Sequence, residues 1–225
     1  MDKTKSNFPA AAAIGDPVES LPIEVASVNG YLTSRRKRVV DILFSVIGLT
    51  AVIVLTPFVA LVTVLTSGLP IFYRRDRLGI YGRQFSMAKF RTMANSENST
   101  RQNLRTEQND PRISQVGWIL RKTYIDELPQ FWNVLMGQMS VVGPRPEFPE
   151  LAVELSQIRK KFPRRLAAKP GITGLAQVRY SYSFDNAHAA GRLPYDLEYI
   201  KRASLRFDIW IIIQTIAKTV RLGGT

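Results

Sequence analysis

An apolar run from Val39 to about Leu69 limits what this chain can fold into more than any other feature of its sequence. Asp41 is the only charged residue in the run. As a straight helix the run would be about 46 Å long, whereas the hydrocarbon core of a bilayer is about 30 Å thick. The run therefore predicts a helix embedded in a membrane, and one that is long for a simple crossing.

Residues within and beside the run predict how it lies in the membrane. Thr56 and Pro57 stand near its middle, and a proline removes a backbone donor and bends a helix. Four consecutive cations, from Arg35 to Arg38, precede the run. Further cations follow it: Arg74, Arg75 and Arg77. Because cations mark the cytoplasmic side, we expect a re-entrant helix broken at Thr56-Pro57. A single tilted span with a proline kink is the alternative.

The composition argues against several classes of site. The 225 residues include no cysteine and one histidine, His188, which we expect at the surface. A disulfide scaffold, a cysteine nucleophile and a multi-histidine metal centre therefore have no basis, so catalysis would rest mainly on carboxylates. The net charge of +13 favours polyanionic partners, namely nucleic acid, anionic lipid headgroups or phosphorylated substrates.

Changes in composition along the chain predict three segments. Residues 1–34 are polar and rich in Ala, Ser and Pro, which predicts a flexible arm. Residues 35–70 hold the re-entrant membrane helix. Residues 71–225 combine sparse strand patterns with more frequent helical ones and show no internal repeat. The expected fold class is α-rich α+β, with a small cytoplasmic domain at the membrane interface.

Two neighbouring carboxylates, Asp126 and Glu127, carry the clearest chemical signal. They precede Pro129, and proline is favoured in the first turn of a helix, so both acids should stand at a helix N-terminus. The helix dipole keeps a carboxylate there ionised, which suits a metal ligand or a nucleophile. Arg121, just upstream, is placed to hold phosphate oxygens. Taken alone, an Asp-Glu pair at a helix start is usually a capping feature.

Other cations and a rigid loop add to this signal. Lys89 and Arg91 stand at the end of a predicted strand. Arg145 lies between two prolines, of which Pro144 is the first, and Glu147 closes the same loop. A guanidinium on a stiff loop suits bidentate phosphate binding. Each element alone also has a plainer explanation, a solvated charged face or a structural corner.

Taken in order, these motifs resemble the bacterial sugar transferase family. Its members are monotopic phosphoglycosyl transferases that start exopolysaccharide, capsule, O-antigen and glycoprotein glycan assembly. The resemblance covers about residues 35–221 and depends on six motifs jointly. They are Lys89–Met93, Asn109–Arg112, Asp126–Gln130, Trp132–Leu135, Met139–Glu147 and Pro170–Gln177. The chain is similar to the minimal catalytic unit of the family.

The resemblance implies a reaction, a cofactor and a location. It implies an enzyme that transfers a phospho-sugar from a UDP-sugar to undecaprenyl phosphate through an aspartyl intermediate and releases UMP, with Mg²⁺ required. The small domain would be catalytic, monotopic on the cytoplasmic face of the bacterial inner membrane, and in contact with anionic lipids. Downstream glycosyltransferases and a second copy of the chain, in a homodimer, stay open as partners, and nucleic acid is not expected.

The resemblance also implies roles for individual residues. Asp126 would be the nucleophile and the Mg²⁺ ligand, and Glu127 would support metal, proton or geometry control. Lys89, Arg121 and Arg145 match basic positions near the phosphates. The other substrate or phosphate contacts expected are Arg91, Pro144, Glu147 and Arg179. Asp196 and Tyr199 are further candidate contacts, because residues 195–200 resemble a family helix near the site.

Two positions depart from the family pattern. Tyr124 replaces a small serine, which would reshape a pocket wall. Val178 and Arg179 follow Gln177 where many members have a Gly-Arg pair, which leaves nucleotide binding by Arg179 open.

Three tryptophans are expected either to dock at the membrane or to pack in the core: Trp118, Trp132 and Trp210.

Two other classes of protein remain as alternatives. A membrane-tethered nucleic-acid-binding protein would explain the basic charge, but it leaves the ordered acidic and proline motifs unexplained. A non-catalytic scaffold on the same fold is the second alternative. The presence of Asp126, Glu127 and the cation set argues against it.

Overall fold

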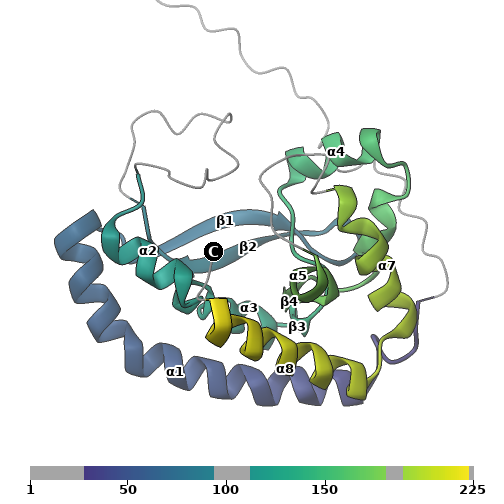
Figure 1. The fold of residues 1–225 in the computed structure, drawn as a ribbon, viewed down its shortest axis with the longest axis horizontal. Coiled ribbons are helices and arrows are strands. Elements are labelled where there is room, and N and C mark those ends of the chain that lie inside the picture. The colour runs from purple at the N-terminus through teal and green to yellow at the C-terminus, as the bar shows by residue number, and fades with distance from the viewer. Residues whose placement is uncertain (1–27, 94–111, 181–189, 223–225) are drawn as a thin grey trace, which may run out of the picture.

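The computed structural model describes residues 28–93, 112–180 and 190–222, and these form a helix-rich α+β fold (Figure 1). The α-rich α+β class expected from the sequence is thereby confirmed. β1 (Phe72–Leu78) pairs antiparallel with β2 (Gln84–Phe90), and β3 (Ser140–Val142) pairs parallel with β4 (Gly171–Thr173). His188 lies outside the described residues. The remaining helices are α2 (Gln115–Lys122), α3 (Gln130–Leu135), α4 (Pro149–Ile158), α5 (Leu175–Arg179), α7 (Leu193–Arg202) and α8 (Leu205–Leu222), with 3-10 helices η1 (Ile80–Gly82), η3 (Ile125–Glu127) and η4 (Phe162–Ala167).

The apolar run forms one helix, α1 (Arg35–Ser67). Ser34 caps its start by accepting a hydrogen bond from the Lys37 amide, and Gly68 ends it with a positive φ of 72°, which glycine adopts readily. The helix is continuous through Pro57, where the sequence predicted a break, and it turns in its second half (Figure 1). The Thr56 hydroxyl donates to the carbonyl of Val52 at 2.7 Å, a contact that commonly accompanies a bend.

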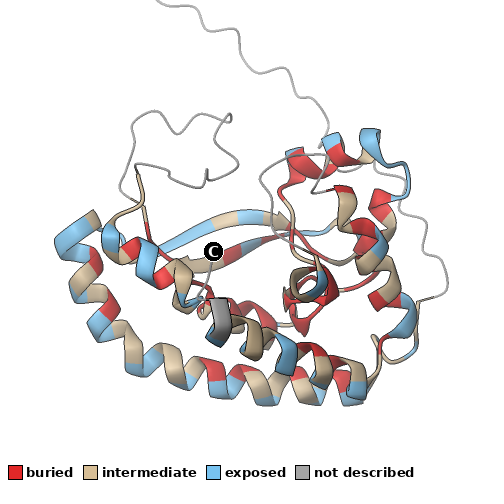
Figure 2. Cartoon of the chain, viewed as in Figure 1, coloured by how far each residue is buried: buried red, intermediate tan, exposed pale blue. Residues whose placement is uncertain are grey.

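Only a narrow stripe of α1 faces the rest of the protein. Its buried residues in the first half recur every three or four positions: Lys37, Asp41, Ser45 and Gly48. At Gly48 the helix comes so close to Phe131 of α3 that a Cβ would lie 2.2 Å from the ring. Most of the remaining surface of α1 is exposed (Figure 2), including Ile47 at 67% and Ile53 at 73%. Among the described residues, α1 is the one helix long and apolar enough to cross a membrane.

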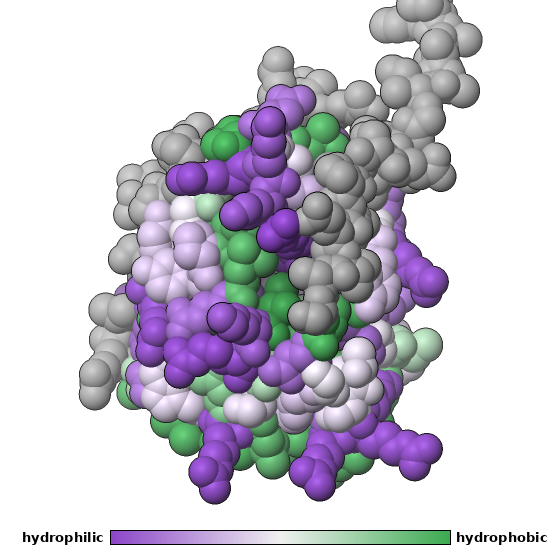
Figure 3. Space-filling model, turned by 90° about the vertical axis from the view of Figure 1, so that its right-hand side faces the viewer, coloured by the Kyte–Doolittle hydropathy of each residue, from purple (hydrophilic) through white to green (hydrophobic). Residues whose placement is uncertain are grey.

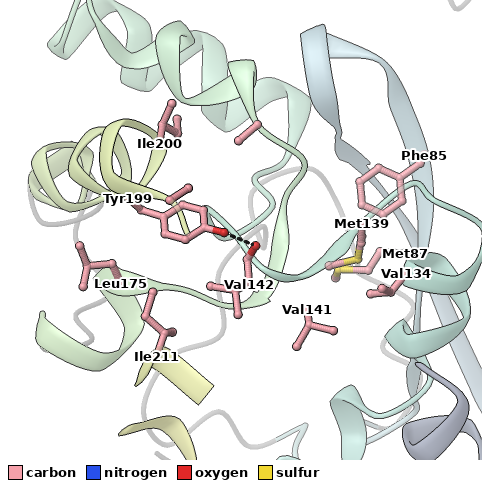
Figure 4. Packing of buried hydrophobic residues seen from close by; sticks show 12 residues of the cluster. Phe85, Met87, Val134, Met139, Val141, Val142, Leu175, Tyr199, Ile200 and Ile211 are labelled. Carbon is pink, nitrogen blue, oxygen red and sulfur yellow. Dashed lines mark hydrogen bonds between the residues drawn. The ribbon is translucent and has the colours of Figure 1, made fainter. Parts of the chain in front are cut away.

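The largest hydrophobic cluster surrounds β3 (Figure 4). Tyr199 and Ile211, from α7 and α8, pack on one side of Val142, while Met87 of β2 packs with residues on the other side. The Tyr199 hydroxyl donates to the carbonyl of Val142 at 2.9 Å. β3 is therefore fixed between the helices and the β1–β2 hairpin, and the loop that follows it begins from a rigid base.

A buried polar network joins the start of α1 to α8. Lys37 Nζ lies 2.8 Å from Asp208 Oδ2 and 3.2 Å from Asp41 Oδ1. The hydroxyls of Tyr31 and Tyr199 both donate to Asp208. Because Tyr31 precedes α1, this network also attaches residues at the end of the predicted N-terminal arm to the folded body. The three segment boundaries themselves stay predictions.

The far end of α1 contacts the same folded body. Arg91 follows β2 and is buried, and its Nη1 donates to the carbonyl of Leu69 just beyond α1. Val59 of α1 packs in a cluster with Phe90 and Leu120. Both ends of α1 are thus attached to one body.

Candidate active site

The backbone turns sharply just before the two acids. Tyr124 has φ 57°, a left-handed conformation that is uncommon for a large side chain and indicates a backbone held by its surroundings. The 3-10 helix η3 follows and carries Asp126 and Glu127, and α3 begins three residues later at Gln130. The acids therefore stand just before a helix, as the sequence predicted.

Two cations from other parts of the chain hold Glu127. Its Oε1 accepts hydrogen bonds from Lys89 Nζ at 2.6 Å and from Arg145 Nη2 at 3.1 Å. Lys89 comes from β2 and Arg145 from the loop after β3. Burial alone would raise the pKa of Glu127, but the charges of Lys89 and Arg145 outweigh it and lower the pKa to about 2. Glu127 is consequently a fixed, ionised carboxylate.

Asp126 has a different environment although it is the next residue in the chain. It is 7% exposed, and no described residue donates a hydrogen bond to its carboxylate. Burial raises the pKa of Asp126 to about 6; Lys89 opposes this shift and the charge of Glu127 adds to it. A buried carboxylate without donors is poorly solvated, and a group perturbed in this way is typical of a reactive or ion-binding position.

Arg121 completes the set of cations around the acids. It lies in the last turn of α2, and its Nε donates to Thr92 Oγ1 at 2.9 Å. Its positive charge lowers the pKa of Asp126, against the effect of burial. Lys89, Arg121 and Arg145 therefore meet the acid pair from three different elements.

The acid pair fits a Mg²⁺ ion shared with a phosphate ligand. Residues 28–93, 112–180 and 190–222 contain no group of three carboxylate or histidine side chains able to cage a metal. Mg²⁺ is commonly held by one or two carboxylates together with substrate phosphates and water. Oε1 of Glu127 is already bound by Lys89 and Arg145, whereas the Asp126 carboxylate has no donor among the described residues. Asp126 is thus the residue that would hold the ion.

Two residues expected to bind phosphate make other contacts. The guanidinium of Arg91 donates to the carbonyls of Met93 and Leu69, so it secures the chain beyond α1. Arg179 lies 3.8 Å from Glu198 and stacks over the ring of Trp210 at 5.1 Å. Neither contacts the acid pair in the described structure, and their predicted roles stay untested.

The remaining predicted contacts lie around the loop that carries Arg145. The carbonyl of Pro144 accepts a hydrogen bond from the Gly171 amide at 2.9 Å, which ties this loop to β4. Glu147 Oε1 lies 3.5 Å from Arg192 and 3.9 Å from Arg165. Tyr199 holds β3 through Val142, as described above.

Arg165 is a residue of this site that the sequence reasoning missed. Its side chain is 3% exposed and lies 2.8 Å from Asp196, which explains why Asp196 is buried. The same guanidinium donates to the carbonyl of Arg145 at 2.8 Å. Residues 162–168 contain two adjacent arginines, Arg164 and Arg165, and the sequence carries no signal that the second of them is buried. Arg165 therefore positions the loop whose own arginine holds Glu127.

Two of the three tryptophans are exposed. Trp118 of α2 and Trp132 of α3 are 54% and 52% exposed. Trp210 of α8 packs instead against Phe207, with ring centroids 5.8 Å apart. The first two are free to meet a membrane interface, while the third contributes to packing.

Comparison with known proteins identifies relatives of this chain. The profile of a family described as bacterial sugar transferase matches residues 32–222. The UDP-glucose:undecaprenyl-phosphate glucose-1-phosphate transferase of Escherichia coli (strain K12) is 39% identical over 81% of this chain and 39% of its own length. The UDP-N-acetylgalactosamine-undecaprenyl-phosphate N-acetylgalactosaminephosphotransferase of Aeromonas hydrophila is 37% identical over 83% of this chain and 44% of its own length.

A shorter relative matches over nearly its whole length. The exopolysaccharide production protein PSS of Rhizobium leguminosarum bv. phaseoli is 37% identical over 83% of this chain and 96% of its own length. The chain thus spans about two fifths of the larger relatives and corresponds to almost all of this one. On the combined match of profile, relatives and motifs, the chain belongs to the bacterial sugar transferase family.

Proposed function

We propose that this protein transfers a sugar phosphate from a UDP-sugar to undecaprenyl phosphate. A carboxylate oxygen of Asp126 attacks the phosphorus joined to the sugar, and the bond from that phosphorus to the bridging oxygen breaks as UMP leaves. An oxygen of the lipid phosphate then attacks the same phosphorus and releases the Asp126 carboxylate. The products are UMP and a sugar linked to the lipid by a diphosphate.

One observation carries this proposal. Asp126 is a buried carboxylate to which no residue in the described part of the chain donates, next to a second carboxylate that Lys89 and Arg145 already neutralise. A carboxylate that attacks phosphorus must not be held by hydrogen bonds from cations, whereas a supporting carboxylate must be held in place by them. The names of the relatives support the substrates, because they specify UDP-glucose, UDP-N-acetylgalactosamine and undecaprenyl phosphate.

The side chains around Asp126 suit a reaction between anions. Lys89, Arg121 and Arg145 are fixed by Glu127 and Thr92 and would offset the charge of two phosphate substrates. Burial keeps bulk water away from the carboxylate, which favours transfer to the lipid over hydrolysis. Mg²⁺ bound at Asp126 would supply further charge neutralisation on the diphosphate.

The placement of α1 supports a monotopic, re-entrant arrangement with both ends on the cytoplasmic side. Tyr31 and Lys37 at one end and Leu69 at the other contact the same folded body. A body on one side of a bilayer reaches both ends only if the helix returns to that side. The acceptor phosphate lies at headgroup level, so this arrangement would bring the site to its substrate.

Release of UMP is the direct test. The full chain in membrane particles would be given a panel of UDP-sugars with undecaprenyl phosphate and Mg²⁺. We expect lipid-dependent release of UMP with one sugar, its loss in Asp126→Asn, and its retention in Asp76→Asn, which makes the same change at an exposed site on β1. Undiminished release by Asp126→Asn would refute the proposed nucleophile.

Mass spectrometry separates the covalent route from direct transfer. Wild-type protein given the UDP-sugar without acceptor should gain the mass of one sugar phosphate on the peptide that contains Asp126. UMP release without any adduct would favour direct transfer between the substrates. Absence of both signals for every sugar would favour the non-catalytic scaffold.

A further inference from the structure

An ammonium group with no partner among the described residues lies beside the start of α1. Lys169 is half buried, and its Nζ makes no hydrogen bond or ion pair with another described residue. The neighbouring Arg38 donates to the carbonyls of Val134 and Leu135 at 2.7 and 2.5 Å, at the end of α3. A Cβ on Gly137 would lie 3.7 Å from both Arg38 Nη2 and Lys169 Nζ, so the two cations face one small space.

The charges around this space are unbalanced. Lys37 is neutralised by Asp41 and Asp208, but neither Arg38 nor Lys169 has a carboxylate partner among the described residues. Burial lowers the pKa of Lys169, the charge of Arg38 lowers it further, and Asp41 opposes the shift only in part. An anion placed between Arg38 and Lys169 would remove this repulsion.

The same space lies where a charged surface gives way to an apolar one. Arg35 and Arg36 are exposed before it, while Val39 and Leu43 on α1 are 54% and 58% exposed, and Met136 beside Gly137 is 59% exposed. Figure 3 shows hydrophobic side chains at the lower edge of the molecule with hydrophilic ones projecting beside them. This pattern is typical of the headgroup level of a membrane.

We infer that Arg38 and Lys169 bind the phosphate of an anionic phospholipid headgroup beside Gly137. Arg38 retains donors beyond the two used on α3, and Lys169 has three. The acyl chains of such a lipid would lie along the exposed apolar face of α1. Gly137, at φ 80°, leaves the space open because it has no side chain. The inference rests on the proposed membrane location and is independent of the proposed reaction.

Native mass spectrometry of the full chain in detergent tests this site. The protein would be titrated with short-chain phosphatidylglycerol and, separately, with phosphatidylcholine of the same chain length. We expect tighter binding of phosphatidylglycerol, weakened about fivefold in Lys169→Gln, because one cation near an anionic surface contributes about that factor. Lys169→Arg should restore the affinity, since it keeps the charge.

The matched control is Lys160→Gln, which changes an exposed lysine just after α4. α4 lies at the top of Figure 1, whereas the start of α1 lies at the bottom. Equal weakening by Lys160→Gln and Lys169→Gln, or equal binding of the two lipids, would overturn the inference. Soluble glycerol phosphate would also be added as a competitor of bound phosphatidylglycerol. If it displaces that lipid as effectively as unbound phosphatidylglycerol does, the site binds free phosphate and the inference is overturned. Since no turnover is measured, a failure here is distinct from a failure of the transferase proposal.

Discussion

Asp126 illustrates a residue whose functional state costs stability. Its folded pKa of about 6 lies above the ordinary 3.8, so the folded state binds the proton more tightly and ionisation destabilises it. In Mg²⁺-free buffer at pH 8, we expect Asp126→Asn to raise the free energy of unfolding by about 1–3 kcal/mol while abolishing transfer. The gain should shrink below pH 6 and vanish near pH 4. Thermal unfolding of the wild type and Asp126→Asn between pH 4 and pH 8 checks this prediction. A variant less stable than the wild type at pH 8 would contradict it.

Glu127 should behave in the opposite way. Its pKa lies below the ordinary 4.5, so its contribution to stability is complete above pH 4.5 and is lost as the pH falls towards 2. At pH 7, Glu127→Gln leaves Lys89 and Arg145 without their carboxylate and should cost about 1–3 kcal/mol. Comparing its melting temperature with that of the wild type at pH 7 and pH 3 measures this. A difference that does not shrink at pH 3 would mean that Glu127 acts through packing and not charge.

At the scale of elements, the attachment of α1 to α8 depends on Lys37. Lys37→Met leaves Asp41 and Asp208 buried without a cation, and we expect a loss of about 3–5 kcal/mol. Lys37→Met combined with Asp208→Asn removes one of those uncompensated charges and should recover part of the loss. Melting temperatures of the wild type, both single variants and the double variant give the coupling. Strict additivity would show that the ion pair does not secure the helix.

The elements themselves were largely predictable, and their long-range partners were not. The length of the apolar run placed α1, and Pro129 placed the helix after Asp126 and Glu127, because those signals are local. The roles of Arg91 and Arg165 depend on a carbonyl 22 residues away and a carboxylate 31 residues away, and no spacing rule encodes such pairs. A cation at a strand end has the same local sequence pattern whether its side chain binds a phosphate or a backbone carbonyl. α1 likewise makes tertiary contacts towards both of its ends, and its own sequence does not specify their partners.

At the scale of the whole molecule, α1 and the folded body form a closed loop. The helix is about 50 Å long, yet residues before and after it contact the same body (Figure 1). In a bilayer this closure and a straight crossing are incompatible, since a crossing would separate the two ends by the hydrocarbon core. The fold therefore links the topology of α1 to the integrity of the site, because β1 follows directly from the far end of α1 and pairs with β2, which carries Lys89.

Cysteine labelling tests this topology. Because the sequence contains no cysteine, only the introduced thiol can react. Thr33→Cys and Ser86→Cys place exposed thiols before and after α1. If both ends face the cytoplasm, a membrane-impermeant maleimide should label neither variant in intact cells and both after permeabilisation, because the reagent reaches only the outer side. Labelling of one variant alone in intact cells would establish a crossing. The contacts of Tyr31 with Asp208 and of Arg91 with Leu69 could not then both form in the membrane, and the acid pair would lose the support that α1 gives to β2.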